Sequence, residues 1–271
     1  MNFGKFSSHD LHLFLDLADA FDVEFFEARD VLFQAKERLF APDCLKPAWS
    51  HLYELPILQH ATQGVELLGG VEFIRQISKS QNQIQFMQDA MNAFDVKMNA
   101  WEPNLAEKEE IRKSLAAIFA FSYSLMLSFR SLKIFGLYLN DLVAIVRDGG
   151  SRSEKALLAA VKIDQTILAC STINAYVSQR VLLNDDQFLK RLRRALVGKL
   201  TLREQKNYQQ MRLTLQVLKE VGADKLSAKD LYRLFVDELA LVAKDRNDDV
   251  GDVEENLRQF AYQFMKQKAV S

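Results

Sequence analysis

The sequence predicts an all-α protein, an elongated bundle of long antiparallel helices followed by a C-terminal set of shorter helices. The first observation is a scarcity of helix-breaking residues, with 10 Gly and 4 Pro among 271 residues. The second is that apolar residues recur every three or four positions over long stretches, which is the period of one helix face. Hydrophobic residues at 49% and charged residues at 26% are typical of a soluble globular chain that can bury a large core.

The segment 111–146 predicts one continuous helix at the centre of this bundle. It contains no proline and a single glycine, and its apolar or small residues alternate by four and three positions. A second stripe on this segment consists of small residues, which let a neighbouring helix come close, so we expect packing on two sides. These small residues are Ala117, Ala120, Ser124, Ser128 and Ser131.

The same segment is also the best candidate for a membrane span, but it is too short. Its longest uncharged stretch, 114–129, has 16 residues including four serines. A membrane helix needs about 20 mostly apolar residues, and Arg130 and Lys133 follow at once. The sequence therefore favours a buried helix, and membrane binding is not expected.

The N-terminal segment predicts a first long helix that runs from Ser7 or Ser8, its cap, to near Phe40. Its apolar residues keep the three-four spacing, and no glycine or proline interrupts it before Pro42. Three of the four prolines then fall within 41–70, and prolines start, kink or end helices. We therefore expect a folded connector at 41–70 with one or two short helices.

Two further long helices are predicted before residue 184. The first covers 73–98, where Phe, Ile and Met residues keep strict spacing. A turn at Asp148–Ser151 precedes a helix over 156–181. Asn174 is the one polar residue in the seam of that helix, and a lone buried asparagine fixes the register of packed helices. We therefore expect Asn174 to be buried.

The regular spacing fades at residue 185, which we take as a soft domain boundary. Residues 1–184 are expected to form the long-helix bundle. Residues 185–271 are expected to form a C-terminal helical part, either separate or packed on the bundle as one domain. Glycines separate its shorter helices. These helices are expected at about 186–197, 201–221, 227–244 and 252–268.

The strongest charge asymmetry lies in Gln187–Lys219, which carries nine cationic residues and one anionic residue. Arginine and lysine are the side chains that bind phosphate groups, so this segment is the candidate site for phosphate or an acidic partner. The acidic segment Ala223–Glu255, with ten anionic and five cationic residues, leaves open that the two segments pair within the fold. The candidate site residues are Lys190, Arg191, Arg193, Arg194, Lys199, Arg203 and Lys206.

A weaker candidate for metal binding lies in the first helix. His9, His12 and Asp16 share one helical face, and two imidazoles with a carboxylate can hold a divalent metal. Because Leu11 and Phe14 define the buried seam, these three side chains are expected to face solvent, and no metal site is predicted. A di-iron centre is excluded, since none of the four histidines has a glutamate three residues before it.

Two stretches resemble motifs of known families without matching their pattern. Leu200–Glu204 and Leu226–Leu231 resemble the two ends of a LuxR-type DNA-binding segment, but the stretch between them is too long for that module. Asn247–Glu255 resembles the magnesium-binding motif of terpene synthases, in which carboxylates gather Mg²⁺ around a diphosphate. Gly251 stands where that motif has Ser or Thr, and a turn with Asp252 as cap of the last helix explains the same residues.

Charge and cysteine content indicate a cytoplasmic protein. The net charge of −1 gives no overall attraction to nucleic acid or anionic lipid. Cys44 and Cys170 are isolated, match no metal or redox spacing, and suit a reducing compartment. The N-terminal apolar run contains charged residues, so no signal peptide is predicted.

The sequence contains no Walker loop, dinucleotide glycine pattern, Gly-x-Ser-x-Gly elbow or Cys-x-x-Cys pair. It therefore predicts no cofactor, and an enzyme is not favoured. We expect a non-enzymatic helical-bundle protein that mediates protein–protein interaction as a scaffold, adaptor or regulator, with homo-oligomerisation as an extension. The alternatives are a nucleic-acid-binding protein that uses the basic stretch 190–212, and a membrane-active helical protein that exposes 115–146.

Overall fold

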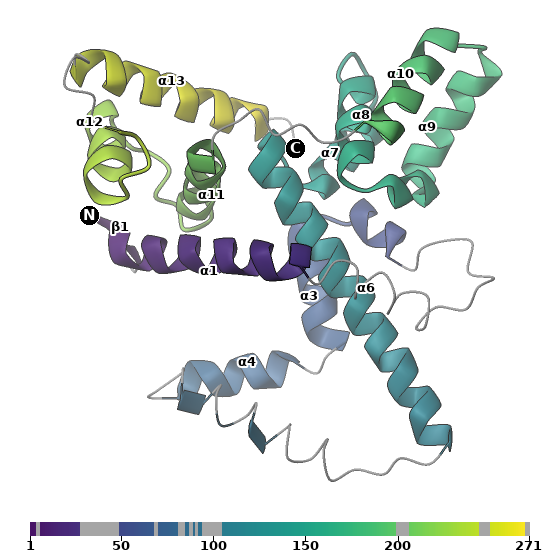
Figure 1. Ribbon diagram of the computed structural model, residues 1–271, viewed down its shortest axis with the longest axis horizontal. Coiled ribbons are helices and arrows are strands. Elements are labelled where there is room, and N and C mark those ends of the chain that lie inside the picture. Colours follow the sequence, from purple (N-terminus) through teal and green to yellow (C-terminus); the bar gives the residue numbers. More distant parts are fainter. Residues whose placement is uncertain are drawn as a thin grey trace.

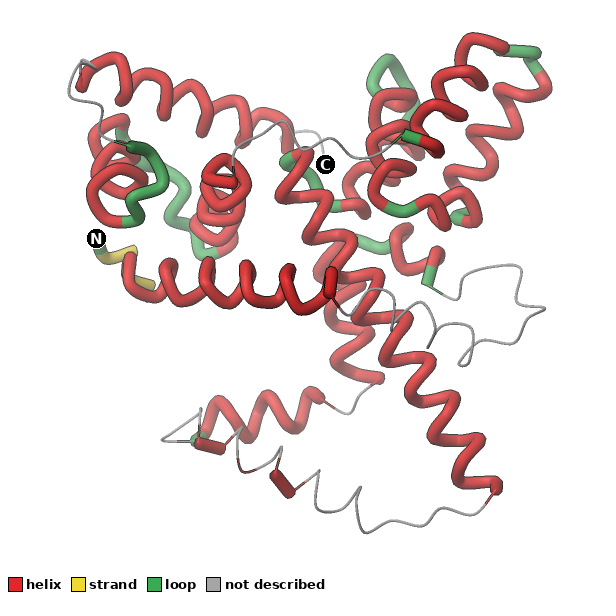
Figure 2. Tube along the Cα trace, viewed as in Figure 1, coloured by secondary structure: helices red, strands yellow, loops and turns green. Residues whose placement is uncertain are grey.

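The computed structural model describes residues 1–3, 6–27, 49–67, 70–80, 85–86, 89, 92–93, 105–198, 206–243 and 250–268. Within these ranges the chain is almost entirely helical, which confirms the predicted all-α class (Figure 2). The exception is a short hairpin near the N-terminus, in which β1 (Asn2–Phe3) pairs antiparallel with β2 (Phe6–Ser7).

The helices divide into those before and those after residue 150. Before it lie α1 (Ser8–Glu27), the 3-10 helix η1 (Ser50–Glu54), α3 (Ile57–Leu67), α4 (Gly70–Lys79), α6 (Leu105–Phe135) and α7 (Leu139–Asp148). After it lie α8 (Ser153–Ile163), the 3-10 helix η2 (Gln165–Ala169), α9 (Ser171–Leu182), α10 (Asp186–Val197), α11 (Lys206–Glu220), α12 (Ala228–Tyr232), the π-helix η3 (Arg233–Glu238) and α13 (Val250–Lys268).

The buried apolar side chains form two hydrophobic clusters that meet at α6. The α7–α10 cluster joins η1 to α7, α8, α9 and α10 around residues such as Leu157 and Phe188. The terminal cluster joins the two ends of the chain, because Leu11 of α1 packs there with side chains of α11, α12, η3 and α13. In Figure 1 the two groups lie on opposite sides of the upper part of α6. The helices run in several directions, and the elongated antiparallel arrangement stays a prediction.

α6 contributes side chains to both clusters. Leu127 belongs to the α7–α10 cluster and Leu132 to the terminal cluster. The expected stripe of small residues is buried wherever its side chains are described, which confirms close packing on that face; the side chain of Ala117 lies outside the described part. The buried members of the stripe are Ala120, Ser124, Ser128 and Ser131.

The prediction of one continuous helix over 111–146 is wrong, because the chain turns at an elbow between α6 and α7. Gly136 has a φ of +76° there, a left-handed conformation that glycine adopts without a steric penalty. The buried Ser128 hydroxyl accepts a hydrogen bond from the N–H of Leu139 (3.1 Å), the first residue of α7. This bond satisfies one of the N–H groups that a helix start leaves unpaired.

The predicted helix over 156–181 is interrupted as well. Asp164 follows α8, and its carboxylate accepts bonds from the Thr166 N–H (2.9 Å) and hydroxyl (2.7 Å), which starts η2. Glu54 of η1 then accepts a hydrogen bond from the second N–H of α9 (2.8 Å). The expectation of a buried Asn174 is also wrong, because this residue of α9 is exposed.

The C-terminal helices follow the predicted order with shifted bounds. α10 has the predicted bounds of 186–197, and the described α11 lies within 201–221. The segment 227–244 contains a shorter helical stretch, in which α12 continues directly into η3. α13 begins at Val250, so Asp252 lies in its first turn rather than at its cap.

The boundary at residue 185 stays a prediction, and the hydrophobic contacts group helices across it. α10 follows the boundary but buries Phe188 and Leu192 in the α7–α10 cluster. α1 lies at the other end of the chain and buries Leu11 and Leu15 in the terminal cluster. Each cluster therefore combines residues from both sides of residue 185.

Some predicted features lie partly outside the described residues. The first helix, predicted to reach Phe40, is described as far as Glu27. Of the predicted helix over 73–98, the structure describes α4 and a few positions beyond it. In the part of the chain that is described, no helix has both the length and the apolar character needed to cross a membrane.

Candidate functional site: the basic face of α10

α10 is an amphipathic helix with a well-defined start. The Asp185 carboxylate accepts a hydrogen bond from the Phe188 N–H (3.0 Å) and pairs with the Arg180 guanidinium (3.2 Å). An acidic cap of this kind satisfies an unpaired N–H and complements the helix dipole. One face of α10 is buried in the α7–α10 cluster through Phe188, Leu192 and Ala195.

The opposite face of α10 carries a row of exposed cations. Lys190, Arg193 and Arg194 are all exposed, and Val197 at the end of the helix is 84% exposed. The four residues follow i, i+3, i+4 and i+7 spacing, so they lie along one side of the helix. Within the described residues none of the three cations forms an ion pair. We call these four residues the basic face of α10.

Arg191 belongs to a different part of the surface. Its guanidinium pairs with the Glu154 carboxylate of α8, which ties α10 to α8. This one cation of the predicted segment is therefore paired within the fold. The bond has a structural role that the neighbouring cations on the basic face do not share.

The structure does not describe the side chains of the remaining predicted site residues. Lys199 and Arg203 lie outside the described residues, and the side chain of Lys206 is not described. α11 packs in the terminal cluster rather than beside α10. Its Arg212 is held by two backbone carbonyls at the end of α6, at 2.8 Å each. The basic stretch is thus divided between the two clusters.

Exposed aliphatic side chains lie at both ends of α10. Leu182 and Leu183 end the preceding helix and its turn, with exposed fractions of 82% and 67%. Val197 lies at the other end of α10. Scattered exposed aliphatic residues are ordinary, but Val197 lies one turn beyond Arg193 and Arg194, and an exposed apolar residue beside unpaired cations is typical of surfaces that bind other molecules.

The three candidate metal ligands of the first helix do not form a metal site. His9 and Asp16 are exposed, and the Nε2 atom of His12 forms a hydrogen bond with the Glu238 carbonyl (2.8 Å). In the described ranges no three His, Cys, Asp or Glu side chains gather in a way that suits a metal ion. His12 instead links α1 to η3.

A histidine–serine pair that sequence reasoning missed lies inside the fold. His60 of α3 is fully buried, and its Nε2 lies 2.8 Å from the Ser124 hydroxyl of α6. The Ser124 hydroxyl in turn donates to the Phe121 carbonyl (2.9 Å). Because both side chains are fully buried and the hydroxyl is already used, this pair does not form an accessible nucleophile.

The same pair belongs to a buried hydrogen-bond network around Asn140 of α7. The two N–H groups of the Asn140 amide face three acceptors, the carbonyls of Leu52 (3.0 Å) and Leu55 (2.8 Å) and His60 Nδ1 (3.2 Å), so one N–H is shared between two of them. The Ser128 hydroxyl donates to Asn140 Oδ1 (2.6 Å). This network fastens α7 to η1, α3 and α6, so it fixes the frame from which α8, α9 and α10 extend.

The network requires a neutral His60. An Nδ1 that accepts from an amide carries no proton, so the proton lies on Nε2. Burial lowers the pKa of His60 to about 4, because a charged imidazolium loses hydration there. No sequence spacing indicated this contact, since His60 and Asn140 are 80 residues apart.

Comparison with known proteins assigns no function to this chain. No family model matches it, and no curated protein and no solved structure is significantly similar to it. The function is therefore inferred from the surface and interior geometry described above.

Proposed function

We propose that this chain is a non-enzymatic protein-interaction protein that binds an acidic partner through the basic face of α10. The observation that supports this proposal is the row of Lys190, Arg193 and Arg194 with the exposed Val197 at its end. The cations have no described counter-ions, and the row lies on a rigid helix. A preformed row of this kind binds with little ordering of its backbone.

The aliphatic residues favour a protein over a nucleic acid as the partner. Phosphate backbones gain affinity from Lys and Arg, but they gain nothing from Val197, Leu182 or Leu183. Protein interfaces combine an apolar centre with charges that steer association and set orientation. The combination of cations and exposed aliphatic residues at α10 fits a protein interface. The complementary surface is a helix or segment with acidic side chains at helical spacing beside an apolar residue.

The proposal is tested by site-specific photo-crosslinking of the full chain in cells. A photo-reactive residue at Val197 is expected to give adducts with one dominant protein. The matched control is Tyr262, which is 64% exposed on α13, a helix that packs in the terminal cluster through Leu257 and Phe264. An adduct of twice the chain mass identifies a second copy as the partner. Equal adduct patterns from the two positions would contradict the proposal.

Charge-reversal variants distinguish an effect of the basic face of α10 from an effect of the net charge of the chain. The double variant Arg193→Glu/Arg194→Glu is expected to abolish the Val197 adduct. Lys225→Glu/Lys229→Glu changes the net charge equally at two other exposed positions, and it is expected to leave the adduct unchanged. If both double variants weaken the adduct equally, the contact is a general charge effect and the assignment to α10 fails.

Nucleic acid remains the second candidate because of the same three cations. It predicts binding to DNA or RNA that falls steeply with salt and is lost in Arg193→Glu/Arg194→Glu. It also predicts that Val197→Ser leaves binding unchanged, whereas a protein partner is expected to bind more weakly to that variant. A mobility-shift titration at two salt concentrations with the two variants decides between these partners.

The expected cytoplasmic location accompanies this proposal. Fractionation of cells that produce the chain at native level, with an antibody against it, measures the location directly. Recovery in the soluble cytoplasmic fraction is the expected result, and recovery in a secreted or membrane fraction would contradict it.

A further inference from the structure

A second surface feature, independent of α10, lies at the elbow between α6 and α7. A cavity of about 330 Å³ opens there between the end of α6, α7, the start of α8 and Arg212 of α11. Its volume is at the lower end of the range of about 300–1,000 Å³ that small-molecule sites occupy. The cavity therefore suits a small or medium-sized molecule rather than a polymer.

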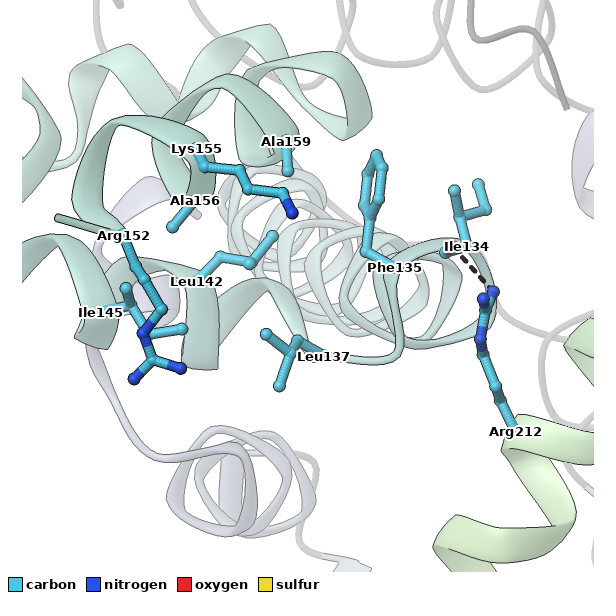
Figure 3. Close-up of a pocket in the computed structure, with 10 residues that line it drawn as sticks. All are labelled: Ile134, Phe135, Leu137, Leu142, Ile145, Arg152, Lys155, Ala156, Ala159 and Arg212. Carbon is cyan, nitrogen blue, oxygen red and sulfur yellow. Dashed lines mark hydrogen bonds between the residues drawn. The ribbon is translucent and has the colours of Figure 1, made fainter. Parts of the chain in front are cut away.

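The walls of this cavity are apolar and its charges have one sign. Phe135, Leu137, Leu142 and Ile145 supply the apolar surface, and two alanines of α8 complete it. Among the described residues that line the cavity, the charged side chains are all cations, namely Arg152, Lys155 and Arg212. Figure 3 shows Lys155 extending from α8 toward Phe135, with Arg152 and Arg212 at opposite sides of the view.

The cations are positioned by different means. Arg212 is fixed by its hydrogen bonds to the carbonyls of Lys133 and Ile134, the second of which is drawn in Figure 3. Arg152, the residue before α8, and Lys155 in its first turn are both exposed, and Figure 3 shows their side chains pointing in different directions along the cavity. Neither forms an ion pair with any described residue. The cavity therefore holds two cations without counter-ions beside one that is anchored.

We propose that the elbow cavity binds an amphipathic anion, a carboxylate or phosphate monoester attached to a medium-length apolar body. The apolar body would lie against Phe135 and Leu142, where its transfer from water is favourable. The anionic head would lie at Lys155, the cation that extends toward Phe135 in Figure 3, where a charge-assisted hydrogen bond forms. A neutral amphipath lacks the charge-assisted hydrogen bond, and inorganic phosphate lacks the contact with the apolar wall.

The test is a calorimetric titration of the full purified chain with octanoate and with octyl phosphate. Both are expected to bind, with 1-octanol at least about ten-fold weaker, as the loss of one charge-assisted bond implies. Inorganic phosphate and octylammonium are expected to show no saturable binding. Equal affinity for octanoate and 1-octanol, or no binding of either anion, would overturn the proposal.

Variants assign the binding to the cavity. Lys155→Gln is expected to weaken octanoate at least about ten-fold, and Lys162→Gln, another exposed lysine of α8 that does not line the cavity, is expected to change nothing. Ala159→Trp places a large side chain in the cavity and is expected to abolish binding. Since Lys155 is exposed, its variant keeps the fold even if the tryptophan variant does not. Unchanged affinity in Lys155→Gln would place the anion elsewhere and overturn the assignment.

The amphipath can reach the cavity as a free acid or as part of a membrane lipid. Co-sedimentation with phosphatidylglycerol vesicles, against vesicles of phosphatidylcholine alone, distinguishes the two sources. Binding to the anionic vesicles that is lost in Lys155→Gln identifies a lipid. Octanoate binding without vesicle binding identifies a free acid. Both results support the shared chemistry, while vesicle binding unaffected by Lys155→Gln together with no octanoate binding contradicts it.

Discussion

The two hydrophobic clusters differ in how their residues are spread along the chain. The α7–α10 cluster takes most of its residues from 120–196, with a few from 49–55, and most of its helices pack against their neighbours in sequence. The terminal cluster combines Phe3, Leu11 and Leu15 with residues 211–264. Contacts between distant residues require a larger loop-closure entropy before they contribute. The α7–α10 cluster can therefore form early in folding, whereas the terminal cluster forms only when the two ends of the chain come together.

The clusters also differ in their buried polar groups. The α7–α10 cluster contains Asp164, whose carboxylate accepts hydrogen bonds from Tyr53 (2.7 Å) and Trp49 (3.3 Å), and it adjoins the network around Asn140. The described part of the terminal cluster buries fewer polar side chains: Thr214 and Gln216 form hydrogen bonds within α11, and Lys133 pairs with Asp19 of α1 (3.8 Å). Buried hydrogen bonds demand one geometry, whereas aliphatic packing tolerates adjustment. The comparison teaches that polar contacts between helices specify the α7–α10 cluster more than they specify the terminal cluster.

The largest expected effect is that of Asn140→Ala. It removes hydrogen-bond partners of the Leu55 carbonyl, of His60 and of Ser128, while the Leu52 carbonyl keeps the Leu55 N–H. Unsatisfied buried groups cost about 1–3 kcal/mol each, so we expect a loss of about 4 kcal/mol. Urea unfolding followed by circular dichroism measures it. Asn174→Ala changes an exposed asparagine of the same cluster and is expected to stay within about 0.5 kcal/mol. Similar losses of stability in both variants would contradict the claim that buried polar contacts specify the α7–α10 cluster.

A matched pair of cavity variants tests whether the clusters loosen separately. Leu11→Ala and Leu157→Ala each remove a fully buried leucine, one from each cluster, and each is expected to lose about 3 kcal/mol. Hydrogen exchange is expected to accelerate in α11–α13 for Leu11→Ala and in α7–α10 for Leu157→Ala. If both variants accelerate the same amides, the two clusters are one cooperative unit.

The pH dependence of stability tests the buried His60. Its pKa is about 4 in the folded chain and about 6.5 when unfolded, so the unfolded chain binds the extra proton first. The stability it contributes is complete above pH 6.5 and falls by about 3 kcal/mol as the pH drops to 4. Denaturant unfolding at several pH values measures this slope, and His60→Gln is expected to flatten it. An unchanged slope in that variant assigns the effect to other groups.

A smaller effect is expected for Glu54→Gln at the start of α9. Partial burial alone would raise the pKa of Glu54, but hydrogen bonds from the Ser171 hydroxyl and the Thr172 N–H lower it to about 2. Replacing the charged acceptor is expected to reduce stability by about 1.5 kcal/mol at neutral pH. The difference from the wild type is expected to shrink as the pH falls from 4.5 toward 2, because the carboxylate is then protonated. The exposed Glu66→Gln serves as control.

The smallest effect, with the opposite sign, is expected at the junction of the clusters. The Ser131 hydroxyl of α6 is fully buried and finds no hydrogen-bond partner among the described residues. Ser131→Ala removes a desolvated polar group without leaving a large void, so we expect a gain of up to about 1 kcal/mol. Thermal unfolding measures it. A loss of stability would show that this hydroxyl is satisfied in solution.

Local patterns predicted helices well where the helix and its cap are close in sequence. α10 has its predicted bounds because Asp185 caps it and Gly198 follows it, both signals within a few residues. The elbow at Gly136 and the break at Asp164 were missed because apolar spacing continues through both. What ends the helices there is tertiary, since Asn140 and Asp164 find partners more than 80 residues away.

The candidate site was predicted in part for the same reason. The spacing of Lys190, Arg193 and Arg194 is a property of one helix and is visible in the sequence. The separation of Arg212 from them, and its place beside Arg152 and Lys155, depends on how α11 packs against α6. Residues that meet through the packing of helices distant in sequence show no common spacing along the chain. The elbow cavity could therefore not be predicted from the sequence.

The cavity at the elbow draws its lining from both halves of the molecule. α7 and α8 belong to one cluster, while Arg212 comes from α11 of the other. A ligand that bridges them binds one mutual orientation of the halves more tightly than any other, and so raises the population of that orientation. By thermodynamic reciprocity, whatever sets that orientation tunes the ligand's affinity by the same factor. The turn at Gly136 brings the end of α6, and with it Arg212, to the side of α7 and α8 where such a ligand would meet both clusters.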